Sequence, residues 1–347
     1  MRGSNPRHLF LGCYTEGTQE GRGTGIAVYR LDDDGALSGD PLVVPAASPS
    51  FLALAPDRLF AVHEELRGGV SAFERSGGSL TALQTVPTGG AEPCHLVHDA
   101  AGGRLLVTNY GSGSVASVGI GDLGALRSAE VIEFPPGRGP VPERQEGPHA
   151  HQFVPAETGS GAWLVADLGG DRLFEYRSSG STLELLGEHP LPPGSGPRHM
   201  AWARGALLVG GELDSRLHVL RRAGGVLKHE GSVLTHFGQD GTESYPSHLE
   251  VAPHGRVAYL ANRARDTIAV FDLEPLDRGD TPALVQEVPS GGLWPRHFAL
   301  HGARLYVANQ RSHEVTVFAV ADPATGQLDP EPVQRVATGS PACVVLA

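Results

Sequence analysis

Histidine, arginine and glutamate residues recur at regular places in this chain, and together they could hydrolyse an ester or a lactone. Arginine supplies a fixed cation whose planar donors suit a carboxylate, a phosphate or a developing oxyanion. Histidine and a carboxylate can move protons near neutral pH. One group could take a proton from water while the arginines stabilise the charge on the carbonyl oxygen. The residues concerned are His149, His151, Arg198, His199, Glu212, His248, Arg263, Arg296 and His297.

The Pro148-His149-Ala150-His151 segment differs from the other histidine segments. On a β-strand it places two imidazoles on one face, because side chains two residues apart point the same way. We therefore favour a functional interpretation of His149 and His151. A His-x-His pair with a nearby carboxylate can also hold a divalent metal ion. Because the sequence contains no tight cluster of further ligands, we predict a reaction that uses neither a metal nor a cofactor.

Several of these residues also have a structural interpretation. A histidine repeated at one place in each unit can hydrogen-bond neighbouring backbone, which we favour for His95, His199, His248 and His297. Asparagines at strand ends can be ordinary turn residues, which we favour for Asn109, Asn262 and Asn309. Glu212, Arg263 and Arg296 could form structural ion pairs. The candidates for substrate binding are nevertheless His151, His199, His248, Asn262, Arg296 and His297.

One short unit is repeated seven times along the chain. Each copy begins with a proline step and a first apolar run, and the first six copies continue with a second run that ends in a polar residue. An alternating run and a weaker fourth run follow in most of these. Such runs, separated by Gly, Asp and Ser, are strand signals, and no segment has a sustained helical period. The steps are Pro49-Ser50-Phe51, Pro93-Cys94-His95, Pro148-His149-Ala150-His151, Pro197-Arg198-His199, Pro246-Ser247-His248, Pro295-Arg296-His297 and Pro341-Ala342-Cys343.

This repetition predicts an all-β, seven-bladed β-propeller with four antiparallel strands per blade. The chain starts at a second-type strand near Leu9 and stops after a first-type strand at Leu346, so the two ends should share one blade and close the ring. Two β-sandwiches, the alternative, explain neither the sevenfold count nor this offset. We expect a single domain over residues 1–347, with blades at about 8–45 plus 341–347, 49–88, 93–134, 148–190, 197–235, 246–289 and 295–338.

Propeller geometry brings two sets of polar residues to one mouth of the central channel. The innermost strand of a blade and the strand after it are antiparallel, so the start of the first lies beside the end of the second. The proline steps are the first-strand starts. The second strands end at Glu64, Asn109, Asp167, Glu212, Asn262 and Asn309. The linkers 135–147 and 235–245 enter at the same face and could wall it.

Composition narrows the class of partner. The 347 residues include 27 Lys and Arg against 39 Asp and Glu, a net charge of −12 that argues against nucleic-acid and anionic-membrane binding. Three widely spaced cysteines form no disulfide framework, which suits a reducing compartment. The N-terminal apolar run is too short for a signal peptide, and no run approaches the length of a membrane span. We expect a soluble, cytoplasmic monomer or weak homodimer.

The sequence resembles the seven-bladed propeller lactonases, which include bacterial 6-phosphogluconolactonase of the propeller type and fungal carboxy-cis,cis-muconate cyclase. The resemblance runs almost from end to end. It rests on Gly12-Cys13-Tyr14-Thr15, Gly25-Ile26, Pro148-His149-Ala150-His151, Gly196-Pro197-Arg198-His199, Glu212-Leu213, Ala261-Asn262-Arg263, residues 266–271, Pro295-Arg296-His297-Phe298 and Val307-Ala308-Asn309-Gln310.

The resemblance implies that a His, two Arg and a Glu at the propeller mouth carry the reaction. Matched motif by motif, these are His149, Arg198, Glu212 and Arg263, although His151 could take the place of His149 because this step has one extra residue. The implied function is hydrolysis of an anionic sugar-acid lactone, 6-phosphogluconolactone first among them. Glu212 or His149 would be the general base, and Arg198 and Arg263 would hold the oxyanion. A muconate-type lactone cycloisomerase and a non-enzymatic binding scaffold are the alternatives.

Overall fold

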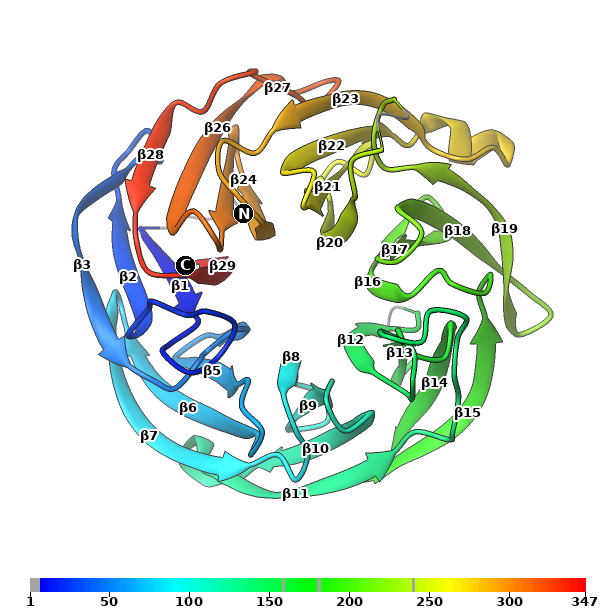
Figure 1. Ribbon diagram of the computed structural model, residues 1–347. Coiled ribbons are helices and arrows are strands. Elements are labelled where there is room, and N and C mark those ends of the chain that lie inside the picture. Colours follow the sequence, from blue (N-terminus) through cyan, green and yellow to red (C-terminus); the bar gives the residue numbers. More distant parts are fainter. Residues whose placement is uncertain (1–6, 158–159, 180–181, 239–240) are drawn as a thin grey trace.

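The computed structural model describes residues 7–157, 160–179, 182–238 and 241–347, and it shows seven β-sheets in a ring around a central opening (Figure 1). The strands of each sheet are antiparallel to their neighbours. One strand of each sheet lies innermost and contacts the innermost strands of the adjacent sheets. The predicted all-β seven-bladed propeller is therefore confirmed.

The first four blades comprise residues 8–190 and the C-terminal strand. Blade 1 contains β29 (Pro341–Leu346), β1 (His8–Cys13), β2 (Gly25–Leu31) and β3 (Leu37–Pro45). Blade 2 contains β4 (Leu52–Ala55), β5 (Arg58–His63), β6 (Gly69–Ser76) and β7 (Ser79–Pro87). Blade 3 contains β8 (Pro93–Asp99), β9 (Arg104–Asn109), β10 (Ser114–Ile120) and β11 (Leu126–Glu133). Blade 4 contains β12 (Ala150–Pro155), β13 (Ala162–Asp167), β14 (Arg172–Ser179) and β15 (Thr182–Pro190).

The remaining blades follow in chain order. Blade 5 contains β16 (Pro197–Ala203), β17 (Ala206–Gly211), β18 (Arg216–Ala223) and β19 (Val226–Leu234). Blade 6 contains β20 (Tyr245–Val251), β21 (Val257–Arg263), β22 (Thr267–Asp272) and β23 (Ala283–Pro289). Blade 7 contains β24 (Pro295–His301), β25 (Arg304–Asn309) and β26 (Glu314–Asp322), and two short strands, β27 (Gln327–Leu328) and β28 (Gln334–Ala337), share its outer edge.

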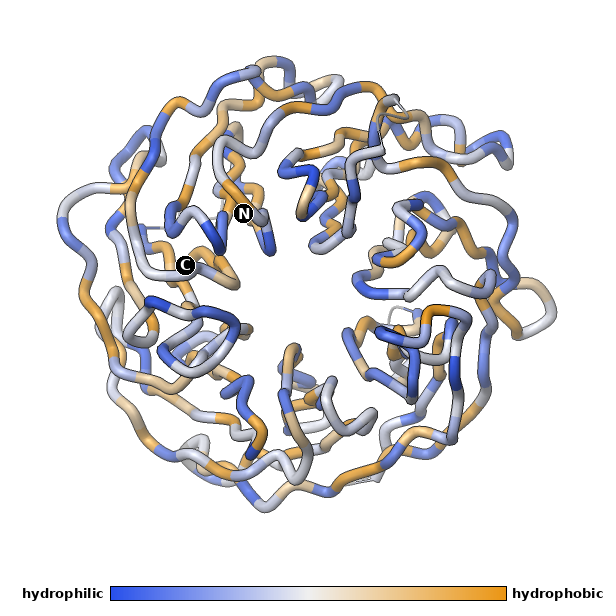
Figure 2. The backbone as a smooth tube through the Cα atoms, in the orientation of Figure 1, coloured by the Kyte–Doolittle hydropathy of each residue, from blue (hydrophilic) through white to orange (hydrophobic). Residues whose placement is uncertain are grey.

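Burial explains why the second strands of the repeat are almost wholly apolar while the fourth are mixed. Every residue of β9 is buried, because blades pack on both of its faces, whereas most of β7 at the rim is exposed. Between blades 3 and 4, Leu106 and Val115 pack against Phe153, Trp163 and Phe174. Figure 2 shows the apolar segments within the strands and hydrophilic loop ends toward the opening. The core therefore lies between blades, and the channel mouth is left polar.

The two ends of the chain close the ring in blade 1. Strand β1 pairs with β29, with Leu9 opposite Leu346 and Gly12 opposite Cys343, as the strand types at the termini predicted. Gly12 is required here because a Cβ at this position would lie 2.0 Å from the carbonyl oxygen of Pro49 in the next blade. This shared sheet closes the ring, because strands from both ends of the chain are hydrogen-bonded within it.

The proline steps are sites of register shift in six of the seven innermost strands. In β16, for example, Arg198 and His199 lie opposite the single residue Gly210 of β17, since Pro197 pairs with Gly211 and Met200 with Val209. Such β-bulges turn neighbouring side chains in new directions. The bulge therefore lets the arginine point to the mouth while the histidine enters the channel.

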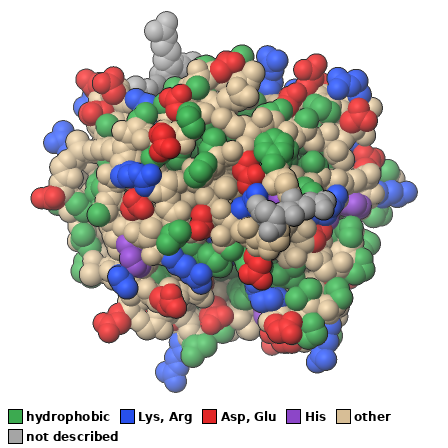
Figure 3. Space-filling view, turned by 45° about the horizontal axis from the view of Figure 1, so that its top comes forward, with side chains coloured by type: hydrophobic (Ala, Val, Ile, Leu, Met, Phe, Trp, Pro, Cys, Tyr) green, Lys and Arg blue, Asp and Glu red, His purple; other side chains and the backbone are tan. Residues whose placement is uncertain are grey.

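In the part of the chain that the structure describes, the helical content is confined to two short 3₁₀ helices, η1 (Asp122–Gly124) and η2 (Glu274–Arg278), in connections within the blades. No helix among the described residues has the length and apolar character needed to cross a membrane. On the face seen in Figure 3, acidic and basic side chains are interspersed and form no continuous basic field.

Candidate active site

A cavity of about 410 Å³ lies where the inner-strand starts meet the second-strand ends. Two groups of side chains line it. The charged and proton-transferring groups are Glu64, Glu92, Arg144, His151, Arg198, Glu212, Arg263 and Arg296. The remaining lining comes from Gln19, Cys94, Tyr110, Tyr245 and Trp294. Linker 135–147 contributes Arg144 and linker 235–245 contributes Tyr245, whereas residues 239–240 of the second linker lie outside the described chain.

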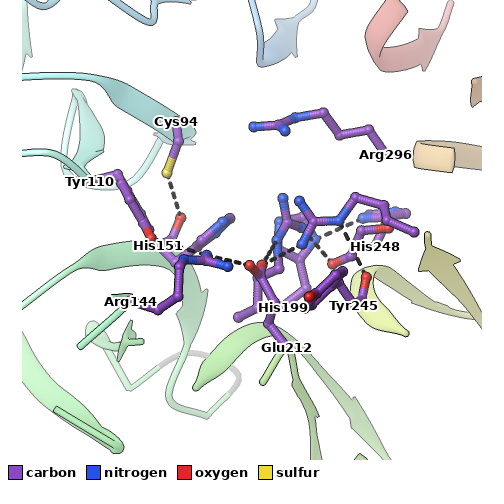
Figure 4. Close-up of polar contacts among 12 residues, drawn as sticks. Cys94, Tyr110, Arg144, His151, His199, Glu212, Tyr245, His248 and Arg296 are labelled. Atoms are coloured by element: carbon purple, nitrogen blue, oxygen red, sulfur yellow. Dashed lines mark hydrogen bonds and ion pairs between the residues drawn. The ribbon is translucent and has the colours of Figure 1, made fainter. Parts of the chain in front are cut away.

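Glu212 is the centre of one side of this cavity (Figure 4). Its Oε2 lies 2.9 Å from Arg198 Nε and 2.5 Å from Arg263 Nη2, and its Oε1 lies 2.5 Å from Arg144 Nη2. Burial alone would raise the pKa of Glu212, but the charges of Arg263, Arg198 and Arg144 outweigh that effect and hold the pKa well below its usual range. Glu212 is therefore a carboxylate at neutral pH.

A second acidic group occupies the opposite side of the cavity. The hydroxyl of the fully buried Tyr14 donates to Glu64 Oε2 at 2.7 Å, and Arg296 Nη2 lies 3.5 Å from Glu64 Oε1. The Arg296 guanidinium also lies over the Tyr14 ring, 4.9 Å from its centroid. Figure 4 shows Arg296 across the cavity from Glu212. Three of the arginines thus pair with Glu212, and Arg296 pairs with Glu64.

His151 lies in the cavity as a neutral imidazole. Burial, and next the charge of Arg198, lower its pKa well below the ordinary value, while Glu212 partly opposes this effect. Its Nδ1 is buried and has no hydrogen-bond partner among the described residues. Its ring lies edge-on to that of Tyr110, with the centroids 5.8 Å apart. A neutral imidazole with an unused nitrogen can accept a proton.

The structure does not bring His149 into the cavity, where the sequence comparison had placed it. Its Nδ1 lies 3.0 Å from the carbonyl oxygen of Tyr110, its Nε2 lies 3.1 Å from Glu146 Oε1, and its ring stacks on Tyr110. Both nitrogens are therefore occupied by protein acceptors. The extra residue in this proline step and the bulge after Ala150 direct His151, not His149, toward Arg198 and Glu212.

The other repeated histidines fill the channel and do not line the cavity. His199 Nδ1 lies 2.9 Å from His248 Nδ1, and the His248 ring stacks on that of His297, with the centroids 3.8 Å apart. The amide N–H of Phe153 donates to His95 Nδ1 at 3.5 Å, and that of Val344 to His297 Nδ1 at 3.4 Å. Both bonds join neighbouring blades. The side chains of His199, His248 and His297, which the sequence predicted to bind substrate, therefore have no direct access to the cavity.

Asn262 also lies outside the cavity lining, in a structural position. Its side-chain amide donates to the carbonyl oxygen of Thr235 at 2.8 Å and to Thr267 Oγ1 at 3.3 Å. Asn309 makes the equivalent bonds to Ser290 and Thr316 in blade 7. These asparagines join the end of the second strand to the third strand and to the connection that arrives from the preceding blade. Of the predicted site residues, the cavity unites His151, Arg198, Glu212, Arg263 and Arg296.

Sequence reasoning missed several polar or aromatic residues at the cavity, among them Tyr14, Tyr110, Arg144 and Trp294. Tyr14 stands in a motif that was noted only as part of the resemblance, and Arg144 lies in a linker considered only as a wall. Tyr110 follows a second strand directly, and Trp294 precedes the proline step of blade 7. None of these carries a repeated pattern, so only tertiary structure places them. Within the described chain, no group of three or more His, Cys, Asp or Glu residues is arranged to hold a metal ion.

Comparison with known proteins finds similarity over nearly the whole chain. A family model described as "Lactonase, 7-bladed beta-propeller" matches residues 8–346. A 6-phosphogluconolactonase of Bacillus subtilis is 32% identical over 351 residues, covering 96% of this chain and 97% of that protein. A crystal structure from Lactobacillus plantarum superposes with a TM-score of 0.89 at 27% identity, covering 99% of each chain. A structure described as a periplasmic gluconolactonase of Pseudomonas aeruginosa has a TM-score of 0.85 at 28% identity, covering 98% of each chain.

Proposed function

The chain belongs to the lactonase family of seven-bladed β-propellers, and on that premise we propose that it hydrolyses the lactone of a phosphorylated sugar acid, 6-phosphogluconolactone first among them. The observation that carries the proposal is the cavity in which neutral His151 lies beside a carboxylate surrounded by three arginines. Four arginines against three glutamates leave it an excess of positive charge in a chain of net charge −12. Such a cavity suits an anionic substrate.

In this proposal His151 is the general base. Water attacks the lactone carbonyl carbon while the imidazole takes one of its protons, and Arg198 and Arg263 stabilise the oxyanion that forms. When the tetrahedral intermediate collapses, the bond between the carbonyl carbon and the ring oxygen breaks. The imidazolium returns the proton to that oxygen, which becomes a hydroxyl. The carboxylic acid product then releases a proton to solvent.

Glu212 has a different role from the base that the sequence suggested. Both of its oxygens are already engaged by arginines, whereas His151 Nδ1 has no hydrogen-bond partner among the described residues. Its charge instead holds Arg198 and Arg263 in place and stabilises the imidazolium that His151 becomes during the reaction. We assign Glu212 as a positioning and electrostatic group.

Proton release from freshly prepared 6-phosphogluconolactone, followed at constant pH, tests this function. After subtraction of the uncatalysed rate, we expect acceleration by the wild type and a loss of 100-fold or more in Arg198→Gln, the usual effect of removing one oxyanion donor. The exposed Arg127 at the rim of blade 3 supplies the control variant Arg127→Gln, which should keep full activity. No acceleration by the wild type would exclude this substrate. Full activity in Arg198→Gln would show that the site is misplaced.

We extend the proposal to a cytoplasmic location. Cys13, Cys94 and Cys343 are all buried and unpaired, which suits a reducing compartment. The relative from Pseudomonas aeruginosa is described as periplasmic, so the compartment needs its own measurement. Cell fractionation should recover the protein with cytosolic markers, and recovery with periplasmic or secreted markers would contradict this part of the proposal.

A further inference from the structure

Arg144 differs from the other three arginines of the cavity in its exposure. Its side chain is 37% exposed, against 4% for Arg198, 7% for Arg263 and 13% for Arg296. It lies in the connection between β11 and β12, near the surface end of the cavity, whereas the others extend from strands or strand starts. Arg144 is thus the arginine that an incoming ligand meets first.

Among the described residues, the Arg144 side chain is also held by fewer backbone contacts than those of Arg198 and Arg263. Arg198 Nη1 donates to the carbonyl oxygen of Ser247 at 2.6 Å, and Arg263 Nε donates to that of Tyr245 at 3.2 Å. These backbone bonds hold both guanidiniums in addition to their contacts with Glu212. Arg144 contacts Glu212 and the Tyr110 hydroxyl, and within the described chain both contacts use the same nitrogen, Nη2. Its Nε and Nη1 remain for another acceptor.

The backbone beside Arg144 is held firmly, so exchange of partner requires only a side-chain movement. The neighbouring Gln145 is buried, and its amide donates to the carbonyl oxygen of Leu168 at 2.9 Å and to Asp171 Oδ1 at 2.8 Å. The Gln145 side-chain oxygen accepts the N–H of Val141 at 3.2 Å. Rotation about side-chain bonds can move an exposed arginine head by several ångströms without disturbing this anchor.

Charge balance identifies the kind of ligand that would draw Arg144 away. Three guanidiniums surround the single carboxylate of Glu212, while Arg296 is paired with Glu64 on the opposite side. A phosphate monoester carries a charge of about −1.5 to −2 at neutral pH, and its oxygens match the planar fork of arginine. Glu92 also lines the cavity, and its negative charge repels an anionic ligand unless a cation binds that ligand.

We propose that Arg144 selects the phosphorylated form of the substrate by exchanging its contact with Glu212 for the substrate's phosphate group, while Arg198 and Arg263 stay on Glu212. This inference rests on the proposed function and names the residue that recognises the phosphate group of its substrate. Departure of Arg144 leaves Glu212 with two cations, so more of its charge acts on His151 when the substrate is bound. Phosphate recognition thereby favours proton transfer to His151.

Calorimetric binding of the two hydroxy acids, 6-phosphogluconate and gluconate, tests the inference because they differ only in the phosphate. Arg144→Gln should weaken 6-phosphogluconate binding tenfold or more and change gluconate binding less than twofold. The exposed Arg138 in the same connection provides the matched control, Arg138→Gln, which should bind both acids like the wild type. In activity assays, Arg144→Gln should lower the ratio of kcat/KM for 6-phosphogluconolactone to kcat/KM for glucono-δ-lactone.

The outcomes separate this inference from the proposed function. Equal losses for both acids, or no loss for either, would overturn the role of Arg144 even if the wild type hydrolyses lactones. A selective loss of 6-phosphogluconate binding, in a wild type that hydrolyses neither lactone, would uphold the phosphate site and overturn the lactonase. A wild type that binds neither acid would overturn the phosphate site, and the hydrolysis assay would then decide on the lactonase separately.

Discussion

Replacing His95 by glutamine should make the fold less sensitive to acid. His95 is buried in the channel, with its ring centroid 4.3 Å from that of Phe51 and 6.1 Å from that of His199. Burial, together with the charges of His297 and Arg198, lowers its pKa to about 3. The unfolded chain has the ordinary value near 6.5. At a pH between these two values, His95 is protonated in the unfolded state and neutral in the folded state.

The sign and the size of the effect follow from that difference. Above about pH 6.5 both states are neutral at His95, and as the pH falls below that value the folded state loses stability. From pH 7.5 to 5.0 this one group should lower the free energy of unfolding by about 2 kcal/mol, because nearly all unfolded chains and about 1% of folded chains are then protonated there. Glutamine does not titrate in this range and can accept the same N–H of Phe153.

Urea unfolding of the wild type and of His95→Gln at pH 7.5 and 5.0 measures this contribution. Any cost of the altered packing is independent of pH and cancels in the difference between the two conditions. The variant should lose about 2 kcal/mol less than the wild type on going to pH 5.0. Phe51→His, which introduces an imidazole at the equivalent place in blade 2, should enlarge the loss. Equal losses in His95→Gln and the wild type would refute the assignment of His95 as a buried neutral imidazole.

Three further changes test other parts of the account. Glu212→Gln leaves three guanidiniums without a carboxylate, so urea unfolding should show a loss of about 3–5 kcal/mol, and unchanged stability would contradict the central ion cluster. Burial raises the pKa of Glu250 to about 7, above its value in the unfolded chain, so its ionisation lowers the stability of the folded state as the pH rises toward 8. Glu250→Gln should therefore raise the melting temperature at pH 8 and leave it nearly unchanged at pH 4. A lower melting temperature of the variant at pH 8 would contradict this prediction. Tyr14→Phe removes the 2.7 Å hydrogen bond to buried Glu64 and should lower the free energy of unfolding by about 1–3 kcal/mol, which thermal unfolding can detect.

The fold could be predicted because the same sequence pattern recurs seven times along the chain. Seven proline steps, each followed by short apolar runs, specify seven similar sheets, and the strand types at the two termini specify how the ring closes. The outer edge of blade 7 could not be predicted in detail. There Pro330 and Pro332 lie between β27 and β28, and proline lacks the N–H that a continuous strand would use.

The site was predicted less completely, for two physical reasons. Strand alternation alone gives no sign of the bulges at the proline steps, which send Arg198 and Arg296 to the cavity and their neighbouring histidines into the channel. The same geometry decides between His149 and His151, which the sequence left open. Arg144 lies in a non-repeated connection, and its approach to Glu212 is a contact between residues 68 positions apart. Such a contact depends on the whole ring.

The most direct test of the proposed mechanism compares His151→Gln with His149→Gln in the hydrolysis of 6-phosphogluconolactone. Both variants remove an imidazole from the same segment, and only that of His151 lines the cavity. The account predicts that His151→Gln lowers kcat by about 100-fold or more, the contribution of a general base, while His149→Gln retains most of the wild-type rate. Full activity in His151→Gln, or loss of activity in His149→Gln alone, would contradict the placement of the reaction at this cavity.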